Sequence, residues 1–449
     1  MFANPTGKAN HVSNGRTLDD LSLSHQRRPS PTVRILMPLL HGLAGIAALI
    51  AIAVLFSLDR RRINIRTVVS ALLLQCAIGV LILFVPAGRW ALHGISLVVN
   101  DVLGYGNDGI SFLFGDLVGE RMFTLFPHGG FVFALRVLPQ IIYISALIAV
   151  LYHLGVMQLL ARILGGGVRA LLRTSVIESF SAVTTIFLGQ SEMPIAIRPF
   201  VPLLTRAELF AVMSSGTASV AGSVLAGYAG LGVPLDYLLA ASFMAIPGGL
   251  LFAKLLLPSS EPSRIVTLQL DFEEHKPANL FEAVAIGTAN GVRVAVAVGS
   301  MLIAFIGLIA CLNGLVGWAG GLFGVHGLSL QQILGWGFAP LAWLIGVPWN
   351  ASVIVGGIIG QKIVFNEFVA YVQLSPMIHA HSLDPRSLAI ASFALCGFAN
   401  LSSIGILLAG FGAVAPERRA EVARLGLRAV LAGTLSNLMS ATIAGIFIS

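Results

Sequence analysis

Charged side chains are scarce in this sequence, and their scarcity excludes a soluble globular protein. Asp, Glu, Lys and Arg make up 10% of the 449 residues, whereas about 25% is usual in soluble domains. Too few charges remain to cover a surface that faces water. Apolar runs such as residues 33–58 are long enough to cross about 30 Å of hydrocarbon, so lipid is the solvent of this chain.

Cysteines and enzyme motifs are also rare or missing. Cys76, Cys311 and Cys396 lie inside apolar segments without CxxC or Cys/His spacing, which excludes a disulfide framework or a zinc site. The sequence has no HExxH, no GxSxG and no Walker loop. We therefore expect neither an enzyme nor an ATP-driven pump, and no cofactor beyond a coupling cation.

The positive charge is placed as in a membrane protein, not as in a nucleic-acid-binding protein. Arginines cluster in short loops between apolar runs, at residues 60–66, 162–173 and 418–428. All three clusters fall on one side if the N-terminus is outside, and the positive-inside rule makes that side cytoplasmic. Arg27, Arg28 and Arg34 argue for the opposite orientation. The sequence thus predicts a multi-pass protein of the cell inner membrane with its N-terminus outside.

The apolar segments predict an all-α polytopic membrane protein with about eight transmembrane helices. The semi-polar segment 88–127 is typical of helices at the membrane interface. The spans are expected near residues 34–57, 66–86, 131–153, 206–229, 234–257, 291–317, 385–413 and 430–448.

Two further apolar stretches, residues 172–203 and 331–374, are interrupted at mid-length by polar residues and by Gly or Pro. They predict re-entrant helical hairpins, because irregular backbone at membrane depth must be buried in protein or line a watery cavity.

An internal repeat follows the hairpins. The first is followed by LTRAELFAVMSSGTASVAGSVLAGYAG (204–230) and the second by LDPRSLAIASFALCGFANLSSIGILLAGFGA (383–413). Each segment is a helix broken by Gly and small polar residues, and each precedes one more span. Because the two units start on opposite sides, they form an inverted repeat with broken helices, an architecture that places a substrate site at the membrane midplane.

This organisation divides the chain into six parts. They are a disordered polar tail (1–32), N-terminal spans and interfacial helices (33–130), a scaffold span (131–171), the first inverted repeat (172–257), a loop and second scaffold span (258–330), and the second inverted repeat (331–449).

Each hairpin carries a carboxylate near its turn. Glu192 follows Gly189 in the first hairpin; it either meets a ligand inside the membrane or reaches the headgroups and is solvated there. In the second hairpin, Glu367 either forms a structural ion pair with Lys362 or accepts hydrogen bonds from the vicinal hydroxyls of a sugar.

The helix breaks carry small polar residues, which either permit close helix packing or bind a ligand and a cation. These residues are Ser214, Ser215, Ser219 and Ser223 in the first copy and Asn400, Ser402 and Ser403 in the second.

Four motifs carry a family resemblance: GQSE (189–192), LTRAELFAVM with ASVAGSV (204–224), NEFVAY (366–371) and CGFANLSSIG (396–405). With them, the chain resembles the concentrative nucleoside transporters, in their bacterial nucleoside permease branch, from the first span to the end. The resemblance implies a homotrimeric, cation-coupled nucleoside symporter that works by an elevator-like step. A carrier of another small polar solute, such as a nucleobase, is the alternative.

The resemblance also implies the site. The nucleobase would meet Gln190, Ser191, Glu192 and Val224, and the ribose would meet Glu367, Phe398, Asn400 and Ser403. Val224 and Phe398 follow from the resemblance alone.

The coupling ion is implied at Thr185, Ser214, Ser215, Ser219 and Val220. Sodium-coupled relatives commonly have Asn where this chain has Thr185, and a proton-coupled branch has a small hydroxyl residue. This difference favours protons, with Glu192 or Glu367 as the carrier, but a hydroxyl still offers an oxygen to sodium.

Overall fold

The computed structural model describes residues 31–126, 131–259, 261–265 and 277–448. These residues are almost entirely helical and contain no β-strand, which confirms the all-α class. Among them, seven helices are long and apolar enough to cross a membrane, or eight if the bent pair α13–α14 counts as a span. The predicted polytopic membrane fold is therefore confirmed. Of the predicted tail, residues 1–30 lie outside the described part of the chain.

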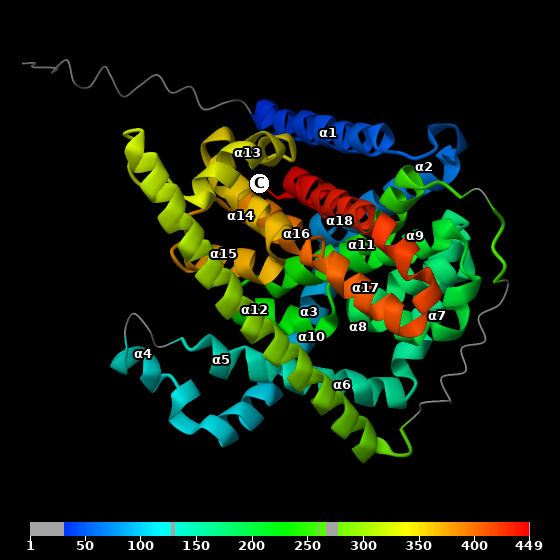
Figure 1. Cartoon of the computed structure of the whole chain (residues 1–449), viewed down its shortest axis with the longest axis horizontal. Coiled ribbons are helices and arrows are strands. Elements are labelled where there is room, and N and C mark those ends of the chain that lie inside the picture. The colour runs from blue at the N-terminus through cyan, green and yellow to red at the C-terminus, as the bar shows by residue number, and fades with distance from the viewer. Residues whose placement is uncertain (1–30, 127–130, 260, 266–276, 449) are drawn as a thin grey trace, which may run out of the picture.

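The N-terminal part consists of three longer helices and two short ones; in Figure 1 the first of them lies along the upper edge of the molecule and the two short ones lie at the lower left. The predicted interfacial segment 88–127 is occupied mostly by the single long helix α3. The elements are α1 (Pro31–Leu55), α2 (Ile65–Gly79), a π-helical turn (Val80–Phe84), α3 (Pro86–Phe114), α4 (Arg121–Leu125) and α5 (Phe133–Arg136).

The rest of the chain contains the same order of elements twice: span, connecting helix, hairpin, broken helix, span. In Figure 1 the broken helices α9–α10 and α16–α17 run in opposite directions, as the inverted repeat predicts. The first series is α6 (Leu138–His153), α7 (Val156–Leu172), α8 (Val176–Ala196), α9 (Arg206–Ala218), α10 (Gly222–Gly230) and α11 (Leu235–Leu256). The second is α12 (Leu280–Leu322), α13 (Leu330–Leu344), α14 (Trp349–Val364), α15 (Glu367–His379), α16 (Pro385–Leu395), α17 (Ser402–Val414) and α18 (Arg419–Phe447).

The hairpins turn where the sequence places Gly or a capping residue. Within α8 the chain reverses at Gly189, whose φ of 75° and ψ of 178° are not helical. The second hairpin is formed by α14 and α15, and Asn366 caps α15 by accepting a hydrogen bond from the Val369 N–H at 2.9 Å. The helix α13 lies within the predicted hairpin stretch 331–374 but is a separate element, bent by 116° from α14. The two helices are separated at Gly346, whose φ is 109°, and Pro348, so the Gly and Pro of this stretch end α13 and do not form the hairpin turn.

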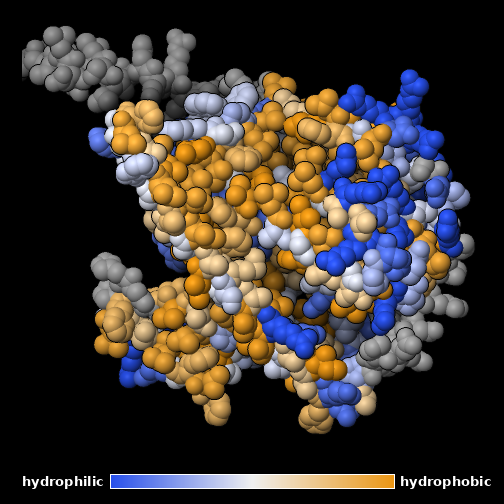
Figure 2. All heavy atoms as spheres, in the orientation of Figure 1, coloured by the Kyte–Doolittle hydropathy of each residue, from blue (hydrophilic) through white to orange (hydrophobic). Residues whose placement is uncertain are grey.

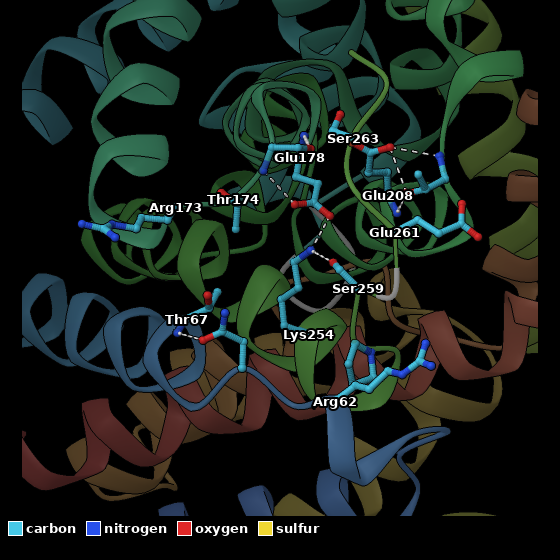
Figure 3. Close-up of a pocket in the computed structure, with 14 residues that line it drawn as sticks. Arg62, Thr67, Arg173, Thr174, Glu178, Glu208, Lys254, Ser259, Glu261 and Ser263 are labelled. Carbon is cyan, nitrogen blue, oxygen red and sulfur yellow. Dashed lines mark hydrogen bonds and ion pairs between the residues drawn. The ribbon is translucent and has the colours of Figure 1, made fainter. Parts of the chain in front are cut away.

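The first hairpin and the first broken helix start side by side in a polar pocket of about 380 Å³ (Figure 3). Capping boxes begin both helices: Ser175 pairs with Glu178, and Thr205 pairs with Glu208. Lys254 of α11 donates to Glu178 at 2.5 Å. Glu178 therefore stabilises the start of the first hairpin and does not lie at its tip.

The three arginine clusters meet at this same end. Arg62 and Arg173 both line the pocket. Arg418 donates to the carbonyls of Val201 (3.2 Å) and Leu204 (2.8 Å), just before α9. Figure 2 shows hydrophilic side chains gathered on the right, where Figure 1 places α7, α9 and the start of α18. Members of the three clusters therefore lie near one another at one end of the molecule, and which side of the membrane this end faces stays a prediction.

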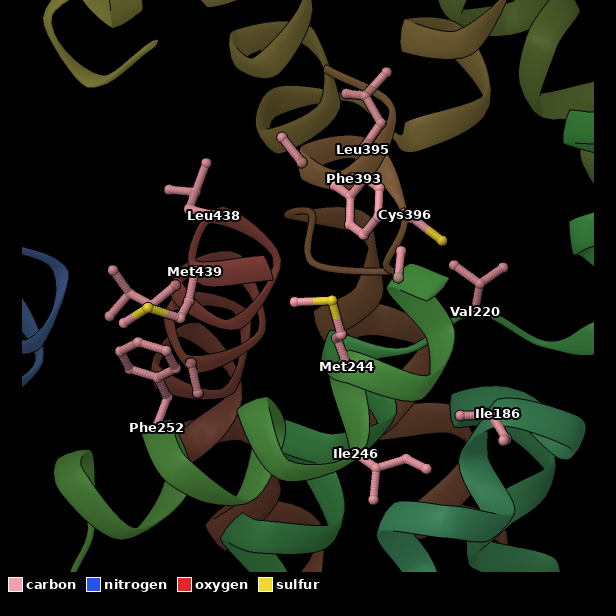
Figure 4. Close-up of a cluster of buried hydrophobic side chains, with 14 of the residues drawn as sticks. Ile186, Val220, Met244, Ile246, Phe252, Phe393, Leu395, Cys396, Leu438 and Met439 are labelled. Atoms are coloured by element: carbon pink, nitrogen blue, oxygen red, sulfur yellow. The ribbon is translucent and has the colours of Figure 1, made fainter. Parts of the chain in front are cut away.

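The spans differ sharply in how much of their surface the chain itself covers. The broken helix α9–α10 is 94% buried over its apolar window, and α11 and α18 are each 83% buried. Figure 4 shows their interface, where Met244 of α11, Phe393 of α16 and Met439 of α18 gather. In contrast, α12 is only 17% buried. The repeats therefore form a packed inner body, and α12 is a peripheral span.

The peripheral helix α12 packs on α6 through glycines. Its 43 residues span about 65 Å, roughly twice the hydrocarbon thickness of a bilayer of about 30 Å. A Cβ at Gly291 would lie 2.6 Å from the Ile142 Cα, and one at Gly287 would lie 2.7 Å from the Ala146 Cα. These atoms are backbone, so they cannot move aside without separating the helices.

We expect Gly291→Val to destabilise the protein by about 1–3 kcal/mol, because the new side chain overpacks the α6–α12 contact. The melting temperature of detergent-solubilised protein, followed by tryptophan fluorescence, measures this effect. Gly307→Val is the matched control, since a Cβ at Gly307 of the same helix meets nothing within 4 Å. Equal melting temperatures for the two variants would contradict the proposed contact.

Candidate functional site

A cavity of about 230 Å³ lies where both hairpin tips, both helix breaks and α12 meet. All eight residues predicted to bind substrate line it. Its volume is close to the lower end of the range for small-molecule pockets, about 300–1,000 Å³. The lining residues are Leu188, Gly189, Gln190, Ser191, Glu192, Ala221, Ser223, Val224, Val294, Ala297, Val298, Met301, Asn366, Glu367, Phe368, Phe398, Asn400, Ser402, Ser403 and Ile406.

A buried carboxylate forms one polar group of the cavity. Glu367 is 4% exposed and is the first residue of α15. One of its oxygens accepts a hydrogen bond from the Tyr228 hydroxyl at 2.9 Å, and the other accepts one from the Asn400 amide at 2.8 Å. A carboxylate has about four acceptor positions, so two remain for a ligand.

Lys362 does not form the ion pair that was the structural alternative for Glu367. Its ammonium donates instead to the Ala394 carbonyl at 2.9 Å and to the Asn437 side-chain oxygen at 2.7 Å. The polar partners of Glu367 are the neutral Tyr228 and Asn400. The carboxylate is therefore held in place without being neutralised by a direct salt bridge.

A second polar group lies at the tip of the first hairpin. The Gln190 amide nitrogen donates to the Ser403 hydroxyl at 2.8 Å, which connects this hairpin to the second helix break. The Gln190 oxygen is buried and has no hydrogen-bond partner among the described residues. Buried acceptors are usually satisfied, so this oxygen is available to a donor on a ligand. Ser191 is exposed and Glu192 half-buried, and both line the cavity.

The wall opposite these groups is apolar. Val294, Ala297, Val298 and Met301 come from one face of α12, at helical spacing. Sequence reasoning missed them, because α12 is hydrophobic on all sides and nothing distinguishes its cavity face. It also missed Tyr228, whose fully buried hydroxyl orients Glu367 from a different repeat.

The two helix breaks are hydrogen-bonded to each other. The Phe398 N–H donates to the Ser219 carbonyl at 3.2 Å. The Asn437 amide nitrogen donates to the carbonyls of Ala218 (2.6 Å) and Cys396 (3.0 Å). These four backbone groups at the breaks are thus satisfied within the protein, as hydrocarbon requires.

The residues predicted for the coupling ion are all buried, on α8, at the end of α9 and in the first break. The Ser219 hydroxyl donates to the Ser215 carbonyl at 2.9 Å, and the Thr185 hydroxyl to the Ala182 carbonyl at 3.1 Å. Within the described ranges, the buried hydroxyls of Ser214 and Ser215 have no partner. Uncompensated oxygens of this kind suit a small hard cation. Val220 offers only backbone atoms to such an ion.

Family models cover most of the chain. A model described as "Na+ dependent nucleoside transporter N-terminus" matches residues 44–117, one described as "Nucleoside recognition" matches residues 134–235, and one described as "Na+ dependent nucleoside transporter C-terminus" matches residues 237–445.

The bacterial relatives match this chain over nearly their full length. A putative nucleoside permease NupX of Escherichia coli is 51% identical, over 92% of this chain and 99% of that protein. The nucleoside permease NupC of Helicobacter pylori is 47% identical, over 91% and 98%. Human solute carrier family 28 member 3 is 36% identical over 90% of this chain and 59% of that protein.

Solved structures agree with the fold. The chain resembles CNTnw in an inward-facing substrate-bound state, with 55% identity, a TM-score of 0.88 and coverage of 91% of this chain and 98% of that one. A CNTnw variant in an outward-facing state gives 56% identity and a TM-score of 0.89, over 92% and 98%.

We expect Gly189→Ala to destabilise the first hairpin by roughly 1–3 kcal/mol, because its backbone conformation is essentially restricted to glycine. A Cβ there would also lie 2.8 Å from the Ala221 Cβ. The melting temperature in detergent measures the loss. Gly166→Ala in α7 is the control, because its Cβ would meet nothing within 4 Å. If Gly189→Ala lowers the melting temperature no more than Gly166→Ala does, the turn tolerates a side chain.

Proposed function

The chain belongs to the concentrative, Na+-dependent nucleoside transporter family, and we propose that it imports nucleosides across the cell inner membrane by symport with a cation. It is a multi-pass membrane transporter and not an enzyme. One observation carries the proposal: a single cavity is lined by a sugar-type acceptor, Glu367, from the second hairpin and by the amide and hydroxyl groups of Gln190 and Ser191 from the first. Ser403 and Asn400 connect Gln190 to Glu367 by hydrogen bonds. A row of polar groups beside apolar side chains suits a molecule with a hydroxylated sugar and a heterocyclic base.

We assign the ribose to Glu367, Asn400, Ser403 and Phe398. The two oxygens of Glu367 are fixed by Tyr228 and Asn400, so their remaining lone pairs can accept hydrogen bonds from two adjacent hydroxyls without rearrangement. Such fixed acceptors reject a ligand that lacks the hydroxyls, because a buried polar group is then left unpaired.

We assign the nucleobase to Gln190, Ser191, Glu192 and Val224. The free Gln190 oxygen offers an acceptor to a ring or amino N–H, and Val224 offers an apolar contact to the flat ring. Ser191 is exposed at the cavity, so its hydroxyl can adjust to different base edges.

The alternative substrate is another small polar solute, such as a nucleobase. A nucleobase would use the Gln190 end and leave Glu367 without a ligand. Competition by uridine, 2′-deoxyuridine, 3′-deoxyuridine and uracil separates the two. Each lost hydroxyl contact should weaken binding by about 1–3 kcal/mol if the ribose assignment holds. Equal competition by uracil would favour the nucleobase.

The coupling ion is a proton or sodium. The hydroxyl at Thr185 favours protons, with Glu192 or Glu367 as the carrier. The unpartnered hydroxyls of Ser214 and Ser215 and the family description favour sodium, which Thr185, Ser214, Ser215, Ser219 and Val220 would hold with oxygen atoms. In either case the bound cation would favour the nucleoside-binding arrangement of the hairpin tip and the break.

We further propose that transport is an elevator-like movement. The polar lining comes from the hairpins and breaks, which belong to the packed inner body. The opposite wall comes from α12, whose side chains at Val294, Val298 and Met301 form no hydrogen bonds and can slide past a moving partner. Inward-facing and outward-facing structures exist for CNTnw, a relative with the same fold.

We also propose that the protein forms a homotrimer and has a defined orientation in the membrane. Much of α12 is exposed in the single chain, including Ile303 at 79%, so it is available for lipid or for other copies in a homotrimer. The end that carries Arg62, Arg173 and Arg418 faces the cytoplasm, and the N-terminus lies outside.

The proposal is tested by uptake of radiolabelled uridine into liposomes that contain the purified protein, under a sodium gradient and, separately, an inward proton gradient. Accumulation under one gradient alone establishes symport and identifies the ion. If folded protein accumulates no nucleoside under either gradient, the proposed substrate is wrong.

We expect Glu367→Gln to reduce uridine uptake by about 10- to 100-fold. Glutamine offers one acceptor and one donor, so its NH2 would face a donor from Tyr228 or Asn400, and one ribose contact would be lost. Initial rates in liposomes, normalised to inserted protein, measure this effect. Glu417→Gln, at an exposed position outside the cavity, is the control. Near-normal uptake by correctly inserted Glu367→Gln would show that Glu367 does not bind the substrate.

A further inference from the structure

A fully buried lysine lies where the two broken helices cross. Lys362, 1% exposed, donates to the Ala394 carbonyl near the end of α16 and to the Asn437 side-chain oxygen. Asn437 of α18 donates in turn to the carbonyls of Ala218, the last residue of α9, and Cys396, which follows α16. Because the Asn437 nitrogen serves those two carbonyls, its oxygen must face the ammonium.

This position is suited to a positive charge. The last carbonyls of a helix lack intrahelical donors and carry partial negative charge. Here the ends of α9 and α16 come together through Asn437, deep in the protein. A buried ammonium needs compensation, and Lys362 donates to two neutral oxygens: the Ala394 carbonyl near the end of α16 and the side-chain oxygen of Asn437, which contacts both helix ends. Carbonyl and amide oxygens around a cation are also what a small metal ion would receive.

The lysine has a counterpart in the first repeat. Lys362 lies five residues before Glu367, the first residue of the returning arm of its hairpin. Thr185 lies five residues before Gln190, which follows the turn at Gly189. The first repeat thus has a small hydroxyl residue, Thr185, at this position, and the helix that follows its hairpin carries the unpartnered hydroxyls of Ser214 and Ser215. The second repeat has a long cationic side chain.

We propose that Lys362 is a resident cation, whose ammonium occupies in the second repeat the place that the first repeat leaves for the coupling ion. The inference rests on the proposed symport. The second repeat then binds no ion of its own, and one positive charge crosses the membrane with each nucleoside. Lys362 is a positioning residue: it holds the second break, and through it Phe398, Asn400 and Ser403, in the geometry that binds the nucleoside.

The number of charges that the unsubstituted protein transports per nucleoside, its charge ratio, tests the role proposed for Lys362. In liposomes loaded with uridine, the membrane potential that stops net flux at a given ion gradient gives the number of charges per nucleoside. We expect one. A ratio of two would overturn the inference, because a second ion would need a second site. If no ion gradient drives uptake, the symport proposal fails and the inference fails with it.

Chemical rescue tests the role of the ammonium directly. Lys362→Met removes the charge and keeps an unbranched chain. Uridine binding to the purified variant is measured at one fixed pH and one fixed sodium concentration, so that occupancy of the first-repeat ion site does not vary. We expect binding at least about tenfold weaker, because buried acceptors lose their donor. Methylammonium should restore it saturably and should leave the unmodified protein unchanged.

Lys254→Met is the matched control, since Lys254 is a second buried lysine, bonded to Glu178 at the other end of the first hairpin. We expect it to lower the melting temperature without producing uridine binding that depends on added methylammonium. Folded Lys362→Met with unmodified affinity, or with weak affinity that methylammonium does not restore, would overturn the inference. If Lys362→Met does not fold, the charge ratio decides.

Discussion

Hydrocarbon offers no hydrogen bonds, and this constraint governs the whole structure. Two helices of the chain are broken at membrane depth, and each break releases backbone groups that water cannot satisfy. The protein satisfies them by crossing the breaks: the Phe398 N–H bonds to the Ser219 carbonyl, and Asn437 bonds to the carbonyls of both helix ends. A site for polar ligands in the membrane is possible because these irregular segments support each other.

The same constraint separates the protein into two kinds of surface. The broken helix α9–α10 and the spans α11 and α18 are largely covered by protein, so they can carry Ser, Asn, Glu and Lys. The helix α12 faces outward and contributes only apolar side chains to the cavity. The polar and the apolar parts of the cavity lining therefore come from different helices, and the polar part comes from those that the protein itself covers.

Buried charges are arranged differently at the two ends of the inner body. At the arginine-rich end, Lys254 pairs with the carboxylate of Glu178 beside a polar pocket. At the crossing of the breaks, Lys362 is held by neutral oxygens, and Glu367 by the neutral donors of Tyr228 and Asn400. A direct ion pair would neutralise Glu367, whereas the observed arrangement keeps its oxygens in place and available.

The sequence by itself determined the membrane class, the order of spans and hairpins, and the polar residues of the tips and breaks, because hydrocarbon makes every polar interruption of an apolar run conspicuous. The motif resemblance added Val224 and Phe398, which periodicity does not distinguish from core residues. Only the tertiary structure decided which long-range partners meet. Tyr228 bonds to Glu367, Lys362 bonds to Asn437 instead of Glu367, and one face of α12 closes the cavity. These contacts depend on how separate helices cross, and local sequence pattern carries no information about that geometry.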